Sequence, residues 1–239
     1  YRLFSAHAIP VPTVLALREE EGFLLLEDCG DTLLEDAART APPHERARLY
    51  RGALDILTRI QAIPRNDDLC FQLSFDFEKL MFEFDFFIEH ALCRFFGVVT
   101  GDPRIPALRE EFAAICAHLV KPELFVLNHR DYHSRNIMVQ SGNLVVIDFQ
   151  DARMGLPQYD CVSLLRDSYM PLPEGEFDDL KDYYFRSSLE AGIHAMTRDG
   201  FDRCFDIMAF QRNVKALGTF GYQSAVLGRA RYRDSIAPT

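Results

Sequence analysis

Three polar residues, Asp131, Asn136 and Asp148, lie in one stretch of this 239-residue chain, residues 128–151, with the sequence NHRDYHSRNIMVQSGNLVVIDFQD. Carboxylate and amide oxygens are hard ligands that suit Mg²⁺, which completes its coordination with water and substrate phosphate oxygens. A further carboxylate beside such a cation could accept or orient the proton of an attacking hydroxyl. The residue types therefore point to a magnesium–phosphate site.

A β-hairpin is predicted to position these residues. Residues 137–139 and 144–147 are apolar and partly β-branched, and the Ser-Gly-Asn run between them is typical of a turn. Folding the segment about Gly142 predicts that Asn136 lies directly opposite Asp148 at the open end. Directly opposed residues have Cβ atoms about 5 Å apart, close enough to share one cation.

The loop that enters the hairpin carries Asp131, which could face the same point. His129 and His133 lie two residues to either side of it. A His-x-Asp-x-His pattern can chelate Zn²⁺, so a zinc site is an alternative. That alternative does not account for the matched positions of Asn136 and Asp148 about the turn, and the magnesium interpretation is preferred.

The segment HRDYHSRN, followed by VIDFQDAR and YDCVSLLRD, resembles the aminoglycoside phosphotransferase-related branch of the protein-kinase-like fold. Within that branch it is similar to the bacterial kinases of the cell-wall amino sugars N-acetylmuramate and N-acetylglucosamine. Protein kinases usually have glycine where Gln150 stands, so the resemblance is to the small-molecule branch. It implies an α+β protein-kinase-like fold, with a mostly helical C-terminal lobe and small β-hairpins.

The resemblance also implies a role for each residue of the site. Asp131 would accept or orient the proton of the acceptor hydroxyl, and Asn136 and Asp148 would hold Mg²⁺ against the phosphates of ATP. Asp151 could assist a second metal or accept a supporting hydrogen bond. The implied reaction transfers a phosphoryl group from ATP to a small molecule, which depends mainly on positioning and charge neutralisation.

Further positions match residues that support the catalytic loop in this family. His129 is expected to pack under the loop and to hydrogen-bond backbone, without direct chemistry. Asp160 is expected to brace the loop through backbone hydrogen bonds. Arg166 and Asp167 are expected to form a buried pair that ties a helix to the loop.

The N-terminal segment resembles the end of a kinase small lobe. Two apolar runs, 13–17 and 22–26, flank a polar stretch and predict an antiparallel hairpin. In the family such strands lead into a hinge. Backbone groups near Glu27 and Cys29 would bind adenine there, because a strand that leaves its sheet exposes donors and acceptors.

The resemblance divides the chain into two parts. Residues 1–31 would be the remnant of an N-terminal lobe, and residues 32–239 the helical C-terminal lobe with the catalytic loop and the substrate cleft. A complete kinase has a Gly-rich loop, a phosphate-binding lysine and its glutamate partner before these strands. We therefore expect that the N-terminal lobe is largely missing from these residues, and that they alone would be a weak kinase at best.

Candidate acceptor-binding residues come from three segments. Arg135 could neutralise a phosphate or a substrate carboxylate such as the lactyl group of muramate, although a surface ion pair is the alternative. The Phe-rich helix predicted at 76–96 resembles a wall of the substrate cleft, with Glu83 and Asp85 as candidates; a core helix is the alternative. On a later helix, three polar residues share one face and could touch substrate or form a solvated face: Gln211, Arg212 and Lys215.

Apolar residues at helical spacing predict the other helices. They lie at 32–38, 44–62, 105–120, 159–169, 176–191 and 198–219. A strand is expected at 124–127, and the run ARMGLPQYD after Asp151 is expected to be a loop. Residues 1–7 are expected to be the tail of an earlier element, and residues 228–239 show no clear pattern.

The composition excludes several classes of function. A net charge of −10 argues against a nucleic-acid-binding face and an anionic membrane surface, and is weakly compatible with a cationic substrate. None of the six cysteines forms a CxxC pair, which favours reduced thiols in the cytoplasm. No signal peptide and no 18-residue apolar span is present in the sequence.

The sequence therefore predicts a cytoplasmic ATP- and Mg²⁺-dependent kinase whose partner is a small molecule, without nucleic acid or membrane. An amino sugar is the expected acceptor. An aminoglycoside antibiotic kinase is one alternative, because an acidic protein would attract a polycation. A catalytically silent kinase-like binding module is another, although such a module has no need to keep Asp131, Asn136 and Asp148 together.

Overall fold

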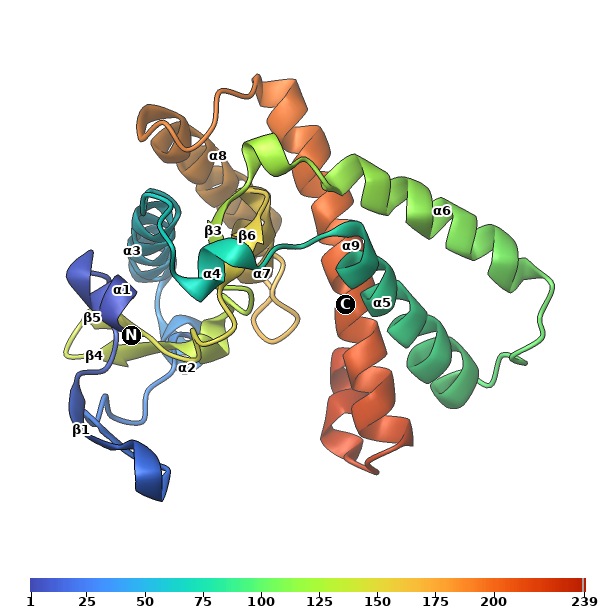
Figure 1. The fold of residues 1–239 in the computed structure, drawn as a ribbon, viewed down its shortest axis with the longest axis horizontal. Coiled ribbons are helices and arrows are strands. Elements are labelled where there is room, and N and C mark those ends of the chain that lie inside the picture. The colour runs from blue at the N-terminus through green and yellow to red at the C-terminus, as the bar shows by residue number, and fades with distance from the viewer. Residues whose placement is uncertain (238) are drawn as a thin grey trace.

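The computed structural model describes residues 1–237 and 239 (Figure 1). Its α-helices are α1 (Arg2–Ala6), α2 (Leu34–Thr40), α3 (Pro43–Gln61), α4 (Leu69–Gln72), α5 (Phe77–Phe87), α6 (Arg104–Leu119), α7 (Gln158–Leu165), α8 (Glu174–Glu190) and α9 (Arg198–Ala225). Its strands are β1 (Val14–Arg18), β2 (Phe23–Leu26), β3 (Val126–Asn128), β4 (Ile137–Gln140), β5 (Asn143–Val146) and β6 (Arg153–Gly155). Short 3₁₀ segments are η1 (Glu19–Glu21), η3 (Pro122–Leu124), η4 (Ser134–Asn136) and η5 (Ala230–Ser235), and η2 (Ile88–Phe95) is π-helical.

The long helices form two groups that meet at α9. On one side α3, α7 and α8 pack against one another, and on the other α5 and α6 form an arm (Figure 1). Helix α9 packs against α7, α5 and η2, so it contacts both groups. The loop after β3 lies between them, next to α7.

Buried tyrosines tie the loop region to the helices. The Tyr132 side chain is fully buried, and its hydroxyl donates to the Ala53 carbonyl of α3 at 2.7 Å. Tyr184 of α8 is also fully buried and donates to the Pro157 carbonyl, at the start of α7, at 2.8 Å. These bonds satisfy hydroxyls that would otherwise be costly to bury, and they fix α3, α7 and α8 around the loop.

The strands form three separate antiparallel pairs, β1–β2, β3–β6 and β4–β5. Strand β3 covers Val126–Asn128, slightly later than predicted, and pairs with β6 through Leu127 opposite Met154. The prediction of a loop after Asp151 is therefore wrong at Arg153–Gly155. The missed strand has only three residues, too few to show an alternating pattern.

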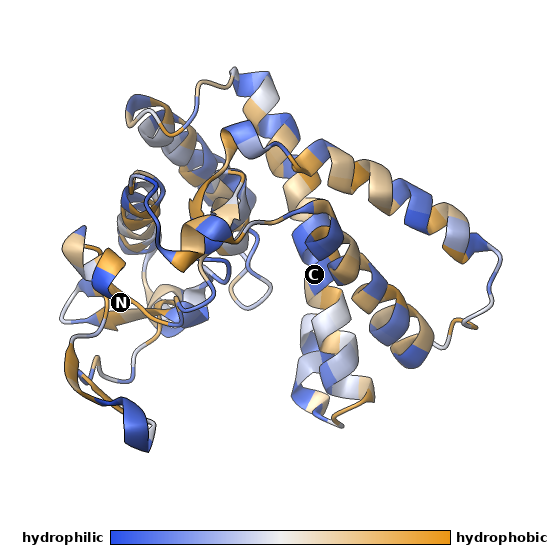
Figure 2. Ribbon diagram, viewed as in Figure 1, coloured by the Kyte–Doolittle hydropathy of each residue, from blue (hydrophilic) through white to orange (hydrophobic). Residues whose placement is uncertain are grey.

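The predicted N-terminal hairpin is confirmed as β1–β2, with Arg18 opposite Phe23. It projects from the body of the molecule (Figure 1). Figure 2 shows that its strands are hydrophobic and its tip hydrophilic. Leucines on both strands are exposed, Leu15 by 60% and Leu24 by 52%.

Several predicted element ends are wrong. Within residues 1–7, Arg2–Ala6 forms α1, and its buried Phe4 packs against the Phe149 ring with 5.3 Å between the ring centroids. The helix predicted at 76–96 is α-helical only to Phe87 and continues as the π-helical η2. The short α4 was not predicted. Within the patternless C-terminal stretch η5 forms a 3₁₀ segment, and residue 238 lies outside the described residues.

Helix α9 continues six residues beyond its predicted end at Thr219, to Ala225. The α7 segment is instead shorter than predicted and ends at Leu165. The six cysteines are free thiols. Within residues 1–237 and 239, no helix combines the length and the apolar character needed to cross a membrane.

Candidate active site

The loop that follows β3 carries His129, Arg130 and Asp131, and α7 holds its backbone. The Asp160 carboxylate accepts hydrogen bonds from the N–H groups of His129 (2.5 Å) and Arg130 (3.0 Å). Burial raises the pKa of Asp160 to about 7, while the charge of Arg212 and the two N–H donors oppose that rise. Asp160 makes the backbone contacts that the family resemblance implies.

His129 lies fully buried beneath the loop. Its ring nitrogen Nε2 lies 2.9 Å from the Ile147 carbonyl, which joins the loop to the end of the hairpin. Burial lowers the pKa of His129 to about 4, so the ring is neutral and Nε2 donates. Its Nε2 therefore does not point to a metal shared with Asp131 and His133. Among the described residues, no group of three or more His, Cys, Asp or Glu side chains could hold a metal.

The hairpin has a register one residue different from the prediction. Strands β4 and β5 pair with Ile137 opposite Val146, and the Ile147 N–H donates to the Asn136 carbonyl at 3.0 Å. Asn136 therefore lies opposite Ile147, and the predicted direct opposition to Asp148 is wrong. The left-handed backbone of Asp148 (φ 65°) directs its carboxylate toward Asn136, and Asp148 Oδ2 lies 3.4 Å from Asn136 Nδ2.

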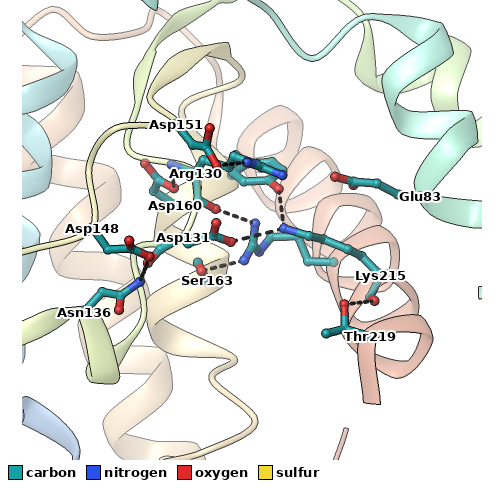
Figure 3. Close-up of polar contacts among 12 residues, drawn as sticks. Glu83, Arg130, Asp131, Asn136, Asp148, Asp151, Asp160, Ser163, Lys215 and Thr219 are labelled. Atoms are coloured by element: carbon teal, nitrogen blue, oxygen red, sulfur yellow. Dashed lines mark hydrogen bonds and ion pairs between the residues drawn. The ribbon is translucent and has the colours of Figure 1, made fainter. Parts of the chain in front are cut away.

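A hydrogen bond fixes the side-chain amide of Asn136. Its Nδ2 donates to the Asp131 carbonyl at 2.9 Å. No described residue donates a hydrogen bond to its Oδ1. The Asp148 carboxylate lies beside the amide (Figure 3), and Gln150 donates to Asp148 Oδ1 at 2.7 Å. Asn136 Oδ1 and the Asp148 carboxylate are hard oxygen ligands that fit Mg²⁺, with water and phosphate oxygens as its remaining ligands.

Helix α9 places two cations near Asp131, Lys215 (Figure 3) and Arg212. Lys215 Nζ lies 3.2 Å from Asp131 Oδ1, and Arg212 donates to the Arg130 carbonyl at 3.2 Å. Burial raises the pKa of Asp131, but the charges of Lys215, Arg212 and Arg130 outweigh burial and hold this pKa well below its ordinary value. Asp131 is therefore an ionised hydrogen-bond acceptor.

A cavity of about 170 Å³ opens beside Asp131. Helix α9 and the segment after α7 supply most of its wall, and α7 and the loop after β3 supply the rest. Its polar lining includes Asp131, His133, Ser163, Tyr169, Arg212 and Lys215. The cavity can receive a small polar molecule against the Asp131 carboxylate.

Glu83 and Gln211 form a buried pair at the arm side of the site. Gln211 Nε2 donates to Glu83 Oε2 at 2.8 Å, and both side chains are at most 5% exposed. The alternative of a solvated helix face is therefore wrong for Gln211. Glu83 Oε1 and Gln211 Oε1 have no partner within the described chain. Figure 3 shows the Glu83 carboxylate pointing toward the Asp131–Lys215 cluster.

Arg135 and Asp85 are both engaged by other side chains. Arg135 Nε lies 2.5 Å from Glu35 Oε2, and its guanidinium stacks on the Tyr169 ring at 3.6 Å from the centroid. Arg135 therefore does not line the cavity itself, but it contacts Tyr169, which does. Asp85 binds Arg109 through two bonds of 2.8 and 2.9 Å, and the structure does not bring it to the cavity.

The predicted buried pair of Arg166 with Asp167 is wrong. The buried Asp167 accepts bonds from the Ser134 N–H (2.9 Å) and hydroxyl (2.5 Å), so it holds the catalytic loop without Arg166. Arg166 is exposed, and its guanidinium lies 3.7 Å from the centroid of the Phe177 ring. Adjacent residues at the end of a helix point in different directions, which explains the separation. Asp151, at the far side of the loop, pairs with Arg130.

The segment after β2 is tied to both hairpins. The Glu27 carboxylate accepts the Thr13 hydroxyl at 2.7 Å, and the Asp28 carbonyl accepts Gln140 Nε2 of β4 at 3.1 Å. The Cys29 thiol lies 3.8 Å from the Glu27 carbonyl. At this predicted hinge, the Cys29 N–H donates to no group of the described residues.

Sequence reasoning missed several residues that shape the site, among them Tyr159, Ser163 and Glu35. Tyr159 and Ser163 lie four residues apart on α7 and therefore share one helix face. This spacing, next to Asp160, could have identified them from the sequence. Glu35 had no such signal, because its contact with Arg135 spans 100 residues.

The model of the phosphotransferase enzyme family (APH) matches residues 1–196 of the chain. The chain belongs to this family. A relative in Pseudomonas aeruginosa, named N-acetylmuramate/N-acetylglucosamine kinase, is 32% identical over 236 residues, which cover 98% of this chain and 68% of that protein. Relatives with the same name in Pseudomonas putida and Neisseria meningitidis are 30% identical and cover 98% and 95% of this chain, and 67% and 68% of their own lengths.

Solved structures show the same fold. The APH(2")-IIa enzyme in a complex with streptomycin and ATP has a TM-score of 0.63 and 15% identity, covering 100% of this chain and 78% of that chain. Choline kinase LicA from Streptococcus pneumoniae has a TM-score of 0.62 and 16% identity, with coverage of 100% and 78%. The predicted α+β protein-kinase-like fold is thereby confirmed, and this member of the phosphotransferase family is a small-molecule kinase.

Proposed function

We propose that this kinase transfers the γ-phosphoryl group of ATP, with Mg²⁺, to a hydroxyl of an amino sugar such as N-acetylmuramate or N-acetylglucosamine. The names of relatives up to 32% identical support the acceptor. One observation carries the proposal. Asn136 Nδ2 contacts both the Asp131 backbone carbonyl (2.9 Å) and Asp148 Oδ2 (3.4 Å), so one side-chain amide joins the loop that carries the Asp131 carboxylate to the proposed metal ligands.

Each residue of the site has a distinct task in this proposal. Asp131 accepts a hydrogen bond from the acceptor hydroxyl and orients it, and Asn136 Oδ1 and Asp148 hold Mg²⁺. When bound, the cation neutralises charge on the ATP phosphates. Backbone groups of Glu27 and Cys29 bind the adenine ring in the segment after β2.

The cavity beside Asp131 is the proposed acceptor site. Arg212 lines it, and Arg135 supports Tyr169 in its wall. The buried Glu83–Gln211 pair does not line this cavity, but the Glu83 carboxylate points toward the Asp131–Lys215 cluster (Figure 3), so the pair is proposed to support the acceptor site from the arm side. Two cations next to Asp131 suit a neutral or anionic sugar and disfavour a polycationic aminoglycoside. Such a kinase would act in the cytoplasm and recycle amino sugars released from the cell wall.

The test measures ADP release by the purified full-length protein with Mg-ATP and a panel of acceptors: N-acetylmuramate, N-acetylglucosamine and kanamycin. We expect turnover on the amino sugars and a rate about 10²–10⁴-fold lower for Asp131→Asn. Turnover on kanamycin alone would overturn the proposed acceptor. Nucleotide binding without turnover on any acceptor would favour a silent binding module.

A further inference from the structure

Lys215 Nζ lies between two oxygen atoms of the candidate active site (Figure 3). It is 3.2 Å from Asp131 Oδ1 and 3.3 Å from the Tyr159 hydroxyl. An ammonium group has three donor hydrogens, so these two contacts leave one hydrogen free. Because Lys215 also lines the cavity, that hydrogen is available to a bound molecule.

The two oxygens of the Asp131 carboxylate are in different situations. Oδ1 is held by Lys215, whereas Oδ2 accepts no hydrogen bond from the described residues. Asp131 lines the same cavity as Lys215. One oxygen is therefore fixed, and the other is open to the hydroxyl of an acceptor.

Helix α9 holds Lys215 in a defined position. Arg212, one turn earlier, donates to the Arg130 carbonyl at 3.2 Å and to Ser163 Oγ at 2.6 Å. The Arg212 guanidinium also lies 4.2 Å from the centroid of the Tyr159 ring. The Lys215 side chain is only 19% exposed, so its pair with Asp131 differs from an exposed ion pair that solvent screens.

We propose that Lys215 is a positioning residue for phosphoryl transfer, which fixes Asp131 Oδ1 so that Oδ2 faces the acceptor hydroxyl. This inference rests on the proposed role of Asp131 as the acceptor-side carboxylate. Without the ammonium, the Asp131 side chain can rotate away from the acceptor. A displacement of about 1 Å in a reacting group can cost about 10²-fold in rate.

A second lysine pair in the same protein provides a matched control. Lys181 of α8 lies 2.9 Å from Asp202 of α9, with side chains 12% and 31% exposed, against 19% and 32% for Lys215 and Asp131. Neither Lys181 nor Asp202 lines the cavity beside Asp131. Removal of Lys181 therefore reports the structural cost of losing such a pair, without the proposed effect on catalysis.

The experiment compares Lys215→Met, Lys215→Arg and Lys181→Met with wild type, by steady-state ADP release on the best acceptor of the panel and by thermal melting. For Lys215→Met we expect kcat to fall about 10²-fold, with KM for ATP within about twofold of wild type. Lys215→Arg keeps a cationic donor for Asp131, so its kcat should be at least about tenfold higher than that of Lys215→Met. Lys181→Met should lower the melting temperature by no more than Lys215→Met, because Asp202 keeps its 2.7 Å pair with Arg198, and it should leave kcat unchanged.

The outcomes separate this inference from the proposed function. A wild-type kcat in Lys215→Met, or a fall in kcat equal to that of Lys181→Met, overturns the positioning role alone. A loss in Lys215→Met that Lys215→Arg does not relieve overturns it as well. Turnover of wild type on aminoglycosides only overturns the amino-sugar acceptor, and the Lys215 comparison then runs on that acceptor. Absence of turnover on every acceptor overturns both.

Discussion

The Asp160 carboxylate accepts the backbone N–H of Arg130 at 3.0 Å, at a residue whose φ of 87° is left-handed. A non-glycine residue rarely adopts that conformation, so surrounding interactions must offset its cost. Asp160→Ala removes the acceptor for one buried and one partly buried N–H group. Each unsatisfied group costs about 1–3 kcal/mol, so we expect the free energy of unfolding in urea to fall by at least about 2 kcal/mol.

Asp206→Ala is the control for this prediction, because Asp206 is an exposed aspartate of α9. It should change the free energy of unfolding by no more than about 0.5 kcal/mol. The Asp160 variant should also lose turnover, because Asp131 follows directly after the braced residues. Equal stability of the two variants would show that Asp160 does not hold the loop.

His129 should make stability depend on pH. Burial lowers its folded-state pKa to about 4, from an ordinary value of 6.5. Below pH 6.5 the unfolded chain binds a proton that the folded chain does not. The stability that neutral His129 provides is therefore fully present above pH 6.5, and it declines as the pH falls toward 4. The total loss is about 3 kcal/mol.

Urea unfolding of wild type and His129→Gln at pH 7 and pH 5 measures this contribution. The variant keeps a donor for the Ile147 carbonyl but has no ring to protonate, so its stability should decrease less between the two pH values. Other buried histidines contribute equally to both proteins and cancel in the comparison. The prediction fails if both proteins lose the same free energy of unfolding.

The sequence predicted the catalytic hairpin but not its register. Ser141 and Gly142 have φ values of 50° and 82°, which make a two-residue turn that closes Gln140 on Asn143. Because Ser, Gly and Asn are all turn formers, composition could not show whether the turn has two or three residues. That difference of one residue decides whether Asn136 lies opposite Ile147 or Asp148.

Local sequence patterns could not predict contacts between residues that are far apart in the sequence. The pair of Lys215 with Asp131 spans 84 residues, and the side chains meet only because α9 packs against α7. Helical spacing correctly placed Arg212 and Lys215 on one face, but it could not tell a solvated face from a buried one. Resemblance to a family supplied the roles of Asp131, Asn136 and Asp148, which spacing alone left open.

Gly221 marks the close contact of α9 with η2, and its replacement should test that packing. A Cβ atom at Gly221 would lie 2.7 Å from the Ala91 Cα and from the His90 carbonyl oxygen, so backbone must shift. We expect Gly221→Ala to lower the free energy of unfolding by about 1–3 kcal/mol. Gly175→Ala in α8 meets no atom within 4 Å and should leave stability unchanged or raise it by up to about 1 kcal/mol. Equal effects of the two variants in urea unfolding would refute a tight α9–η2 contact.

Asp148 should set the requirement for magnesium, because it is the charged ligand of the proposed site. Asp148→Asn keeps an oxygen but loses the negative charge. The Mg²⁺ concentration for half-maximal ADP release should therefore rise about tenfold or more, since affinity for hard cations follows ligand charge. Asn143→Ala, at the exposed turn of the same hairpin, should keep the wild-type magnesium dependence. If both variants show the same Mg²⁺ dependence as wild type, Asp148 is not a metal ligand, and the division of the site into an acceptor-side Asp131 and a metal-side pair must be abandoned.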